Sequence, residues 1–181
     1  MTFARLRATD WVAFAAAIAL LFVMAIDWYS TVAGEEARRI EGLSSNPVGA
    51  LGGEVQREVQ VDARVSAEAA EKNAWQASGV IDRVILVALL ATTVLGVLAA
   101  FGRAGGRDGG GRVLPLSALT ALLASISALL VLYRMIQEPG LDESTVVKAG
   151  APLALVVLGV IALASAMSLR ADDRDTEEVA A

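Results

Sequence analysis

The sequence predicts an all-α fold, an integral membrane four-helix bundle with one partly helical extracytoplasmic insertion. Four apolar runs support this prediction, and they cover residues 11–26, 84–101, 114–133 and 149–169. None of the runs carries a charged residue in its middle. A hydrocarbon core about 30 Å thick requires roughly 20 mostly apolar residues in a helix, with a lower limit near 17. Together with their flanking residues, all four runs are therefore long enough to cross a bilayer.

The composition agrees with a membrane protein and narrows its chemistry. Hydrophobic residues make up 56% of the 181 residues, above the roughly 45–50% of soluble domains, and the mean hydropathy is +0.59. The chain has neither cysteine nor histidine, which excludes disulfides, thiol chemistry and the commonest general base and transition-metal ligand. We therefore expect no enzyme, no cofactor and no metal site. A net charge of −5 also argues against a nucleic-acid partner.

The first transmembrane helix is predicted over residues 11–29. Residues 1–10 before it are expected to form a cytoplasmic N-terminus, because Arg5 and Arg7 favour the inner side under the positive-inside rule. An alternative interpretation is a signal peptide cleaved near the small residues at 31–33.

Aromatic residues mark the ends of several spans. Trp11 stands at one end of the first span, with Trp28 and Tyr29 at the other. A helix places these ends about 26 Å apart, which is the spacing of two interfacial aromatic belts. Trp75 before the second span and Tyr133 at the end of the third are predicted to be further interfacial anchors.

Residues 30–80 form a long segment that we expect on the extracytoplasmic side. One or two helical turns are predicted near 35–41, and glycines and a proline then break regular structure. A helix is predicted near 54–77, where one face carries small apolar residues at helical spacing: Val55, Val59, Ala63, Ala67, Ala70 and Ala74. Such a face buries little area, so two interpretations stay open: a solvated helix resting on the bundle or membrane, and a partner-binding helix.

The rest of the chain alternates spans and short loops. The second span is predicted over 81–101, and a basic, Gly-rich cytoplasmic loop follows at 102–113. This loop lacks the G-x-x-x-x-G-K-[ST] pattern and the preceding strand of a phosphate-binding loop, so we expect it to fix topology and contact anionic lipid. The third span covers 114–134, an extracytoplasmic loop covers 135–148, and the fourth span covers 149–169.

Arginines in the short connecting segments set the expected orientation. All of them fall on one side of the predicted bundle: Arg5, Arg7, Arg103, Arg107, Arg112, Arg170 and Arg174. The positive-inside rule then places both termini in the cytoplasm, in a bacterial plasma membrane. Residues 170–181 are expected to form an acidic, solvated cytoplasmic tail.

Charged residues also gather at the predicted outer ends of the spans. Asp82 begins the second span and Arg134 ends the third, so antiparallel packing of these helices brings the two side chains within reach. Asp27 and Arg83 form a second candidate pair. We interpret both as structural ion pairs at the interface; the alternative is a proton or substrate relay at the mouth of a cavity.

Hydroxyl groups supply the polar atoms in the middle of the spans. These residues are Thr92, Thr93, Ser117, Thr120, Ser125, Ser127 and Ser165. Hydroxyls bond their own backbone or a neighbouring helix, whereas ion and proton pathways usually expose an ionisable side chain partway through a span. The pattern therefore argues against transport.

Four short motifs lie at the outer ends of the spans. They are Ala-Ile-Asp-Trp-Tyr at 25–29, Ala-Trp-Gln-Ala-Ser leading into Val-Ile-Asp at 74–82, Leu-Val-Leu-Tyr-Arg at 130–134 and Lys-Ala-Gly-Ala at 148–151. Together with Pro139 and Gly140 after the third span, they resemble an uncharacterised family of small actinobacterial four-span membrane proteins. The similarity does not extend over residues 34–70 or the tails, and Asp27 stands where that family is expected to have proline. The resemblance implies the architecture and carries no activity.

These observations predict a non-enzymatic multi-pass membrane protein, an accessory, scaffold or assembly component of a bacterial envelope complex. It would act through residues 30–80 or through small-residue helix faces. The expected partners are the lipid bilayer and either another membrane protein or a second copy of the chain. An alternative is a homo-oligomeric channel or small-solute transporter with a hydroxyl-lined pore. A third possibility is an envelope sensor that reports through the acidic tail.

Overall fold

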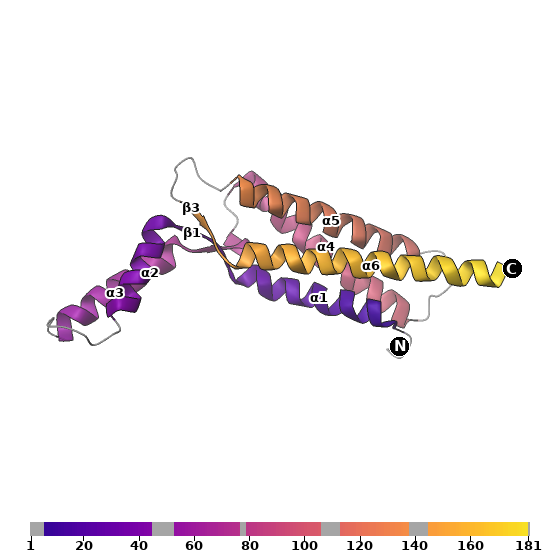
Figure 1. Ribbon diagram of the computed structural model, residues 1–181, viewed down its shortest axis with the longest axis horizontal. Coiled ribbons are helices and arrows are strands. Elements are labelled where there is room, and N and C mark those ends of the chain that lie inside the picture. The colour runs from indigo at the N-terminus through magenta and orange to yellow at the C-terminus, as the bar shows by residue number, and fades with distance from the viewer. Residues whose placement is uncertain (1–5, 45–52, 77–78, 106–112, 138–144, 181) are drawn as a thin grey trace.

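The computed structural model describes residues 6–44, 53–76, 79–105, 113–137 and 145–180. Within these residues, four long helices pack side by side: α1 (Ala8–Ala25), α4 (Val80–Ala104), α5 (Val113–Ile136) and α6 (Gly150–Ala180). Each helix packs against two others, in the ring order α1, α4, α5, α6 (Figure 1). Each also contains a segment long and apolar enough to cross a membrane. The predicted bundle of four membrane-spanning helices is confirmed.

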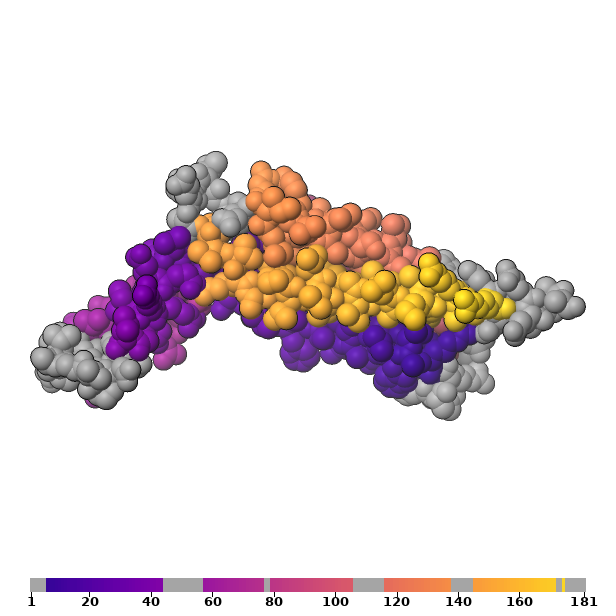
Figure 2. All heavy atoms as spheres, viewed as in Figure 1, coloured from indigo at the N-terminus to yellow at the C-terminus, as the bar shows by residue number. Residues whose placement is uncertain are grey.

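The two ends of the bundle differ. The terminal end holds the start of α1 and the C-terminal part of α6, and the insertion end holds every element other than the four long helices (Figure 1). These are the helices α2 (Val32–Ser44) and α3 (Gly53–Ala70), the strands β1 (Asp27–Thr31), β2 (Lys72–Asn73) and β3 (Thr145–Val147), and the 3₁₀ helix η2 (Ala74–Gln76). The strands form an antiparallel sheet in the order β2-β1-β3. Helices α2 and α3 pack together as a hairpin that extends away from the bundle as a separate lobe (Figure 2).

Side-chain size separates the interior of the bundle from its surface. The fully buried apolar residues are Ala17, Leu20, Met24, Leu89, Ala124, Val131, Ala151, Ala154, Leu158 and Ile161. Large apolar side chains point outward instead, and Phe22, Val87, Leu129 and Leu163 are all more than 60% exposed. An apolar surface of this extent fits a helix bundle whose solvent is lipid.

Small residues and hydroxyls make the closest helix contacts. A Cβ atom added to Gly96 on α4 would lie 3.1 Å from the Ala17 Cβ atom on α1. The Thr92 hydroxyl donates to the Ala88 carbonyl oxygen at 2.8 Å and lies 3.1 Å from the Ser127 Oγ atom on α5. These are the close crossings and hydroxyl bonds expected between helices in a membrane.

The structure corrects the predicted end of the first span. Helix α1 ends at Ala25, and residues 27–31 form strand β1 rather than the last turn of a helix. The cause is local preference reinforced by pairing: the segment is rich in aromatic and β-branched residues, and two distant segments supply strand partners. The small sheet is therefore an addition to the predicted all-α architecture.

Three other boundaries also differ from the prediction. The helix expected near 54–77 ends at Ala70, because Asn73 accepts hydrogen bonds from the Trp75 and Gln76 amides at 3.1 and 3.2 Å and starts η2 instead. Helix α4 continues to Ala104, beyond the predicted end at 101, and α6 continues to Ala180 through the predicted solvated tail. The Gly-rich segment 106–112 lies outside the described residues.

Candidate functional site

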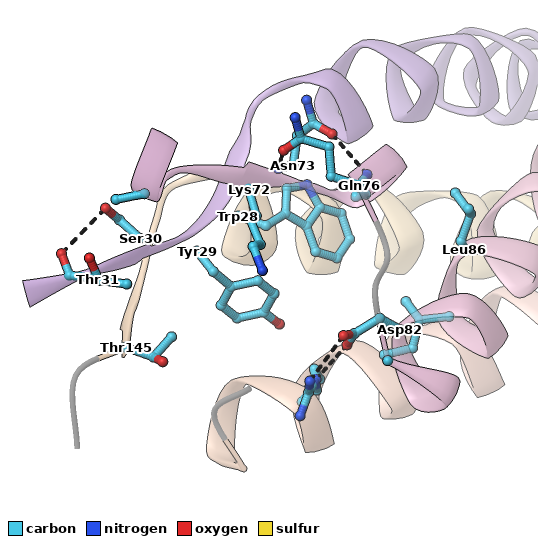
Figure 3. A pocket seen from close by; sticks show the side chains of 15 residues that line it. Trp28, Tyr29, Ser30, Thr31, Lys72, Asn73, Gln76, Asp82, Leu86 and Thr145 are labelled. Carbon is cyan, nitrogen blue, oxygen red and sulfur yellow. Dashed lines mark hydrogen bonds and ion pairs between the residues drawn. The ribbon is translucent and has the colours of Figure 1, made fainter. Parts of the chain in front are cut away.

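A cavity of about 320 Å³ lies at the insertion end, between the small sheet and the first turns of α4. We call it the interfacial pocket. Strands β1, β2 and β3 and the 3₁₀ helix η2 form one wall, and α4 and the end of α5 form the other (Figure 3). Polar side chains from the sheet and charged side chains from both walls face an apolar part formed by Trp28, Ile85 and Leu86.

The Asp82 and Arg134 side chains form an ion pair on the helical wall of this pocket. The Arg134 Nε atom donates to Asp82 Oδ1 at 2.6 Å, and a terminal guanidinium nitrogen donates to Asp82 Oδ2 at 3.1 Å (Figure 3). The other terminal nitrogen donates to the Gln137 carbonyl oxygen at 3.2 Å. The Arg134 side chain is 13% exposed and the Asp82 side chain 19%, so the bidentate pair is partly withdrawn from solvent. The structure thus brings together the two residues that the sequence placed at neighbouring helix ends.

Trp28 supports the pocket from within the protein. Its indole N–H donates to the Val23 carbonyl oxygen at 3.0 Å, a group at the end of α1 that also accepts from the Ile26 amide at 3.2 Å. The side chain is only 2% exposed and lies directly against Gly150 at the start of α6. A Cβ atom at Gly150 would collide with the indole and would lie 2.7 Å from the Asp27 carbonyl oxygen. The prediction of Trp28 as a lipid-facing anchor is therefore wrong.

The other predicted anchors have different surroundings. Trp11, Trp75 and Tyr133 are between 43% and 48% exposed, which is the exposure that an interfacial anchor requires. Tyr29 is half-buried and lines the pocket. In the sheet it lies opposite Lys72 on β2 and Val147 on β3.

A second cluster of charges joins the hairpin to the bundle. Arg38 on α2 forms a two-point ion pair with Glu71, the residue that follows α3. Lys148 pairs with Glu35 on α2, and its ammonium nitrogen lies 3.7 Å from the Glu71 Oε1 atom. Since Lys148 lies between β3 and α6, this cluster links the hairpin to the segment that enters the fourth span.

Asp27 belongs to this second cluster. Burial, and then the neighbouring Glu71 carboxylate, raise the pKa of Asp27 above its ordinary value, while Arg38 and Lys148 oppose the shift. The hydrogen bonds from Arg38 lower the pKa of Glu71. Asp27 and Arg83 are not brought together as an ion pair, because strand β1 turns Asp27 toward Glu71. That correction follows from the strand, which the sequence-based prediction lacked.

The hairpin itself is held by small residues. Gly34 and Ala37 on α2 and Ala63 and Ala67 on α3 are buried, and a Cβ atom at Gly34 would lie 2.5 Å from the Ala70 Cβ atom. Two members of the predicted alanine-rich face, Ala63 and Ala67, therefore occupy the contact between α2 and α3. This part of the predicted apolar face serves the hairpin, whereas Ala74 packs against the core of the bundle.

The terminal end holds a buried polar cluster that sequence reasoning missed. The Asp10 carboxylate accepts hydrogen bonds from the Ser168 hydroxyl at 2.6 Å and from the Arg7 amide at 3.1 Å. The Arg103 guanidinium lies 3.3 Å from Asp10 Oδ1 and donates to the Ser117 hydroxyl at 3.1 Å. Asp10 and Arg103 are only 6% and 8% exposed. The cluster therefore connects α1, α4, α5 and α6 through two buried charges.

The available sequence signals pointed away from this cluster. Asp10 precedes the first apolar run and Arg103 follows the second, so both were assigned to cytoplasmic segments. A cavity of about 10 Å³ beside them has room for about one water molecule. In the described part of the chain, no group of three or more acidic, histidine or cysteine side chains is arranged to hold a metal ion.

The four spans and the apolar outer surface define a multi-pass membrane protein in contact with a lipid bilayer. No protein-family model, curated protein or solved structure matches this chain. What distinguishes this membrane protein is therefore the geometry of its insertion end.

Proposed function

We propose that the protein is a non-enzymatic accessory, scaffold or assembly component of a bacterial envelope complex, and that the α2–α3 hairpin is its working surface. One observation carries this proposal. The hairpin extends away from the bundle (Figure 2) and is joined to it by the charges of Arg38, Glu71 and Lys148. A projecting element fixed to a membrane bundle is suited to contacting another protein.

Exposed apolar side chains on the hairpin support a contact role. Ile40 and Leu43 on α2 are 47% and 69% exposed, and Val61 and Val65 on α3 are 54% and 60% exposed. Val61 and Val65 are four residues apart and so share one helix face. When a partner covers apolar groups on an element outside the membrane, their removal from water lowers the free energy and favours binding.

The non-enzymatic part of the proposal rests on composition. The chain lacks cysteine and histidine, and Lys148, one of its two lysines in the described residues, is engaged with Glu35 and Glu71. Nucleophile activation by a neighbouring base has few groups to draw on here.

The proposed orientation places both termini in the cytoplasm and the hairpin outside. Arg7, Arg170 and Arg174 lie at the terminal end, which supports this topology under the positive-inside rule. Arg5, Arg107 and Arg112 fall outside the described residues. Membership of the actinobacterial family that the chain resembles is part of the same proposal.

The test is mild-detergent extraction from the native membrane at native expression, followed by mass determination of the intact assembly. We expect a second protein in fixed stoichiometry, and we expect Val61→Asp with Val65→Asp to release it. The matched control is Ser66→Asp with Ala69→Asp, which adds the same charge to exposed positions of α3 without removing valines.

Two other results would contradict the accessory role. A monomer without any second protein would remove it. A pure homo-oligomer would favour the alternative channel or small-solute transporter, and flux through liposomes containing that oligomer would then decide between a pore and a homomeric scaffold.

A further inference from the structure

We propose that the interfacial pocket binds a small amphipathic anion, with its carboxylate or phosphate head at Lys72 and its aliphatic part against α4. This site is separate from the exposed hairpin surface, so the inference goes beyond the proposed function. The ligand is defined by its chemistry, and the same chemistry is offered by a free fatty-acid-like anion and by the head of an anionic phospholipid.

The size and the lining of the pocket fit a small organic ligand. Its volume of about 320 Å³ lies at the lower end of the range for small-molecule sites, which combine apolar walls with a few placed polar groups. The lining changes from one side to the other: hydroxyls of Ser30, Thr31 and Thr145 lie at one side, and Leu86 lies at the opposite side (Figure 3). A ligand with one polar and one apolar end matches this change.

The charges around the pocket favour an anion. Lys72 reaches from β2 into the pocket toward the Tyr29 ring (Figure 3). The Asp82 carboxylate also faces the pocket, but Arg134 occupies both of its oxygens at 2.6 and 3.1 Å. The Asp82–Arg134 pair has no net charge, so the Lys72 ammonium gives the lining of the pocket a net positive charge. A ligand cation would meet Lys72 and would find the carboxylate already engaged.

The position of the apolar part supports an aliphatic chain. Ile85 and Leu86 lie on the second turn of α4, inside the candidate membrane span Val80–Ala104. Asp82 lies in the first turn of the same helix and Arg134 in the last turn of α5, both nearer to the insertion end than Leu86, and the sheet lies outside the spans. A ligand held at Lys72 therefore projects its chain toward the depth of the bilayer, where apolar surface is best accommodated.

The first experiment uses octanoate as the probe and the full-length protein in nanodiscs of zwitterionic phosphatidylcholine. The midpoint of thermal unfolding is followed as a function of probe concentration, which gives an apparent Kd. Octanol and octylammonium are the matched controls, with the same chain and either no charge or the opposite charge. We expect octanoate to raise the midpoint to saturation and the two controls to have little effect. Equal responses to all three probes would overturn the proposal.

Three variants locate the site. Lys72→Gln should weaken octanoate binding at least roughly tenfold, because the ligand anion loses its charged hydrogen-bond donor, and Lys72→Arg should restore most of the affinity. Ala74→Phe, which fills the pocket from η2, should abolish saturable binding. Arg39→Gln, at an exposed position on α2, is the control for loss of one positive charge and should bind as the wild type does. Unchanged affinity in both Lys72→Gln and Ala74→Phe would overturn the proposal, and either variant alone suffices if the other fails to fold.

The final arm distinguishes the two sources of the ligand. Part of the phosphatidylcholine is replaced by phosphatidylglycerol. A bilayer anion as the ligand would stabilise the wild type, leave Lys72→Gln unchanged and suppress the octanoate response. Octanoate binding of the same strength in both bilayers would identify a free anion as the ligand.

Discussion

Both ends of the bundle contain an aspartate paired with an arginine, but the two pairs lie in different surroundings. At the terminal end, Asp10 interacts with Arg103 and Ser168 and with the Arg7 amide, and all four long helices meet there. At the insertion end, Asp82 and Arg134 join only α4 and α5, beside a pocket.

This difference shows how burial decides what a charge pair does. A carboxylate removed from water requires several partners, and Asp10 has them from three elements. Asp82 keeps some exposure and needs only the two donors of one guanidinium. The same pair of residue types is therefore an internal brace at one end and part of a cavity wall at the other.

Loss of the buried Asp10–Arg103 ion pair at the terminal end should destabilise the protein most. Asp10→Ala removes the carboxylate and leaves the Arg103 charge buried, which should lower the free energy of unfolding by about 3–5 kcal/mol. The measurement is denaturant unfolding in detergent micelles. Asp62→Ala, at an exposed position on α3, is the control and should be nearly neutral. Replacing both charges, with Asp10→Leu and Arg103→Met, should recover much of the loss; a double variant as unstable as Asp10→Ala would contradict the brace.

The next effect tests packing at the insertion end. Gly150→Ala forces a Cβ atom against the Trp28 indole and the Asp27 carbonyl oxygen, so we expect a loss of about 1–3 kcal/mol from overpacking. Gly159→Ala on the same helix is the control, because nothing lies within 4 Å of its added Cβ atom. That control should be neutral or stabilising by up to about 1 kcal/mol. The midpoint of thermal unfolding should therefore fall for Gly150→Ala but not for Gly159→Ala, and an equal fall in both variants would argue against close packing of Trp28 on Gly150.

The ion pair at the insertion end should contribute less to stability than the one at the terminal end. Asp82→Ala and Arg134→Ala should each destabilise the protein, by about 1–2 kcal/mol, which is less than the loss for Asp10→Ala because the pair is partly exposed. The double variant should lose less than the sum of the single losses. A double-mutant cycle in thermal unfolding measures the coupling. Strict additivity would mean that the contact contributes no interaction free energy.

The smallest effect concerns the pH dependence of the hairpin attachment. The folded-state pKa of Asp27 lies above its ordinary value of 3.8, so its stabilising contribution is complete below that value and is lost as pH rises through the raised pKa. The pKa of Glu71 lies below its ordinary value of 4.5, so its contribution is complete above about pH 4.5 and is lost as pH falls through the lowered pKa.

Asp27→Asn should therefore abolish the loss of stability that occurs in the wild type as pH rises through the raised pKa of Asp27. Between about pH 4.5 and about pH 8 we expect protection of the α2–α3 amides from hydrogen exchange to decline in the wild type but not in the variant. The difference at the upper end should be about two- to fivefold. Asp62→Asn serves as the control, and equal decline in all three proteins would remove Asp27 as the cause.

Some contacts of individual residues could be predicted from the sequence, and others could not. The positions of Asp82 and Arg134 at antiparallel helix ends were sufficient to predict that they come together. Asp10 and Arg103 gave no such signal, because each lies just outside an apolar run and resembles an ordinary flanking charge. Trp28 fits an interfacial anchor and a buried residue equally well by type, and only its contacts with the Val23 carbonyl oxygen and Gly150 distinguish the two.

The sequence by itself determined the four membrane spans, because transfer of a long apolar run into a bilayer depends only on that run's own length and composition. Tertiary structure decided the sheet, the hairpin attachment and the charge partners. Asp10 and Ser168 are separated by 158 positions, and the three strands come from three separate parts of the chain. The free energy of such pairings depends on groups that no local stretch of sequence contains, so only the packed structure decides them.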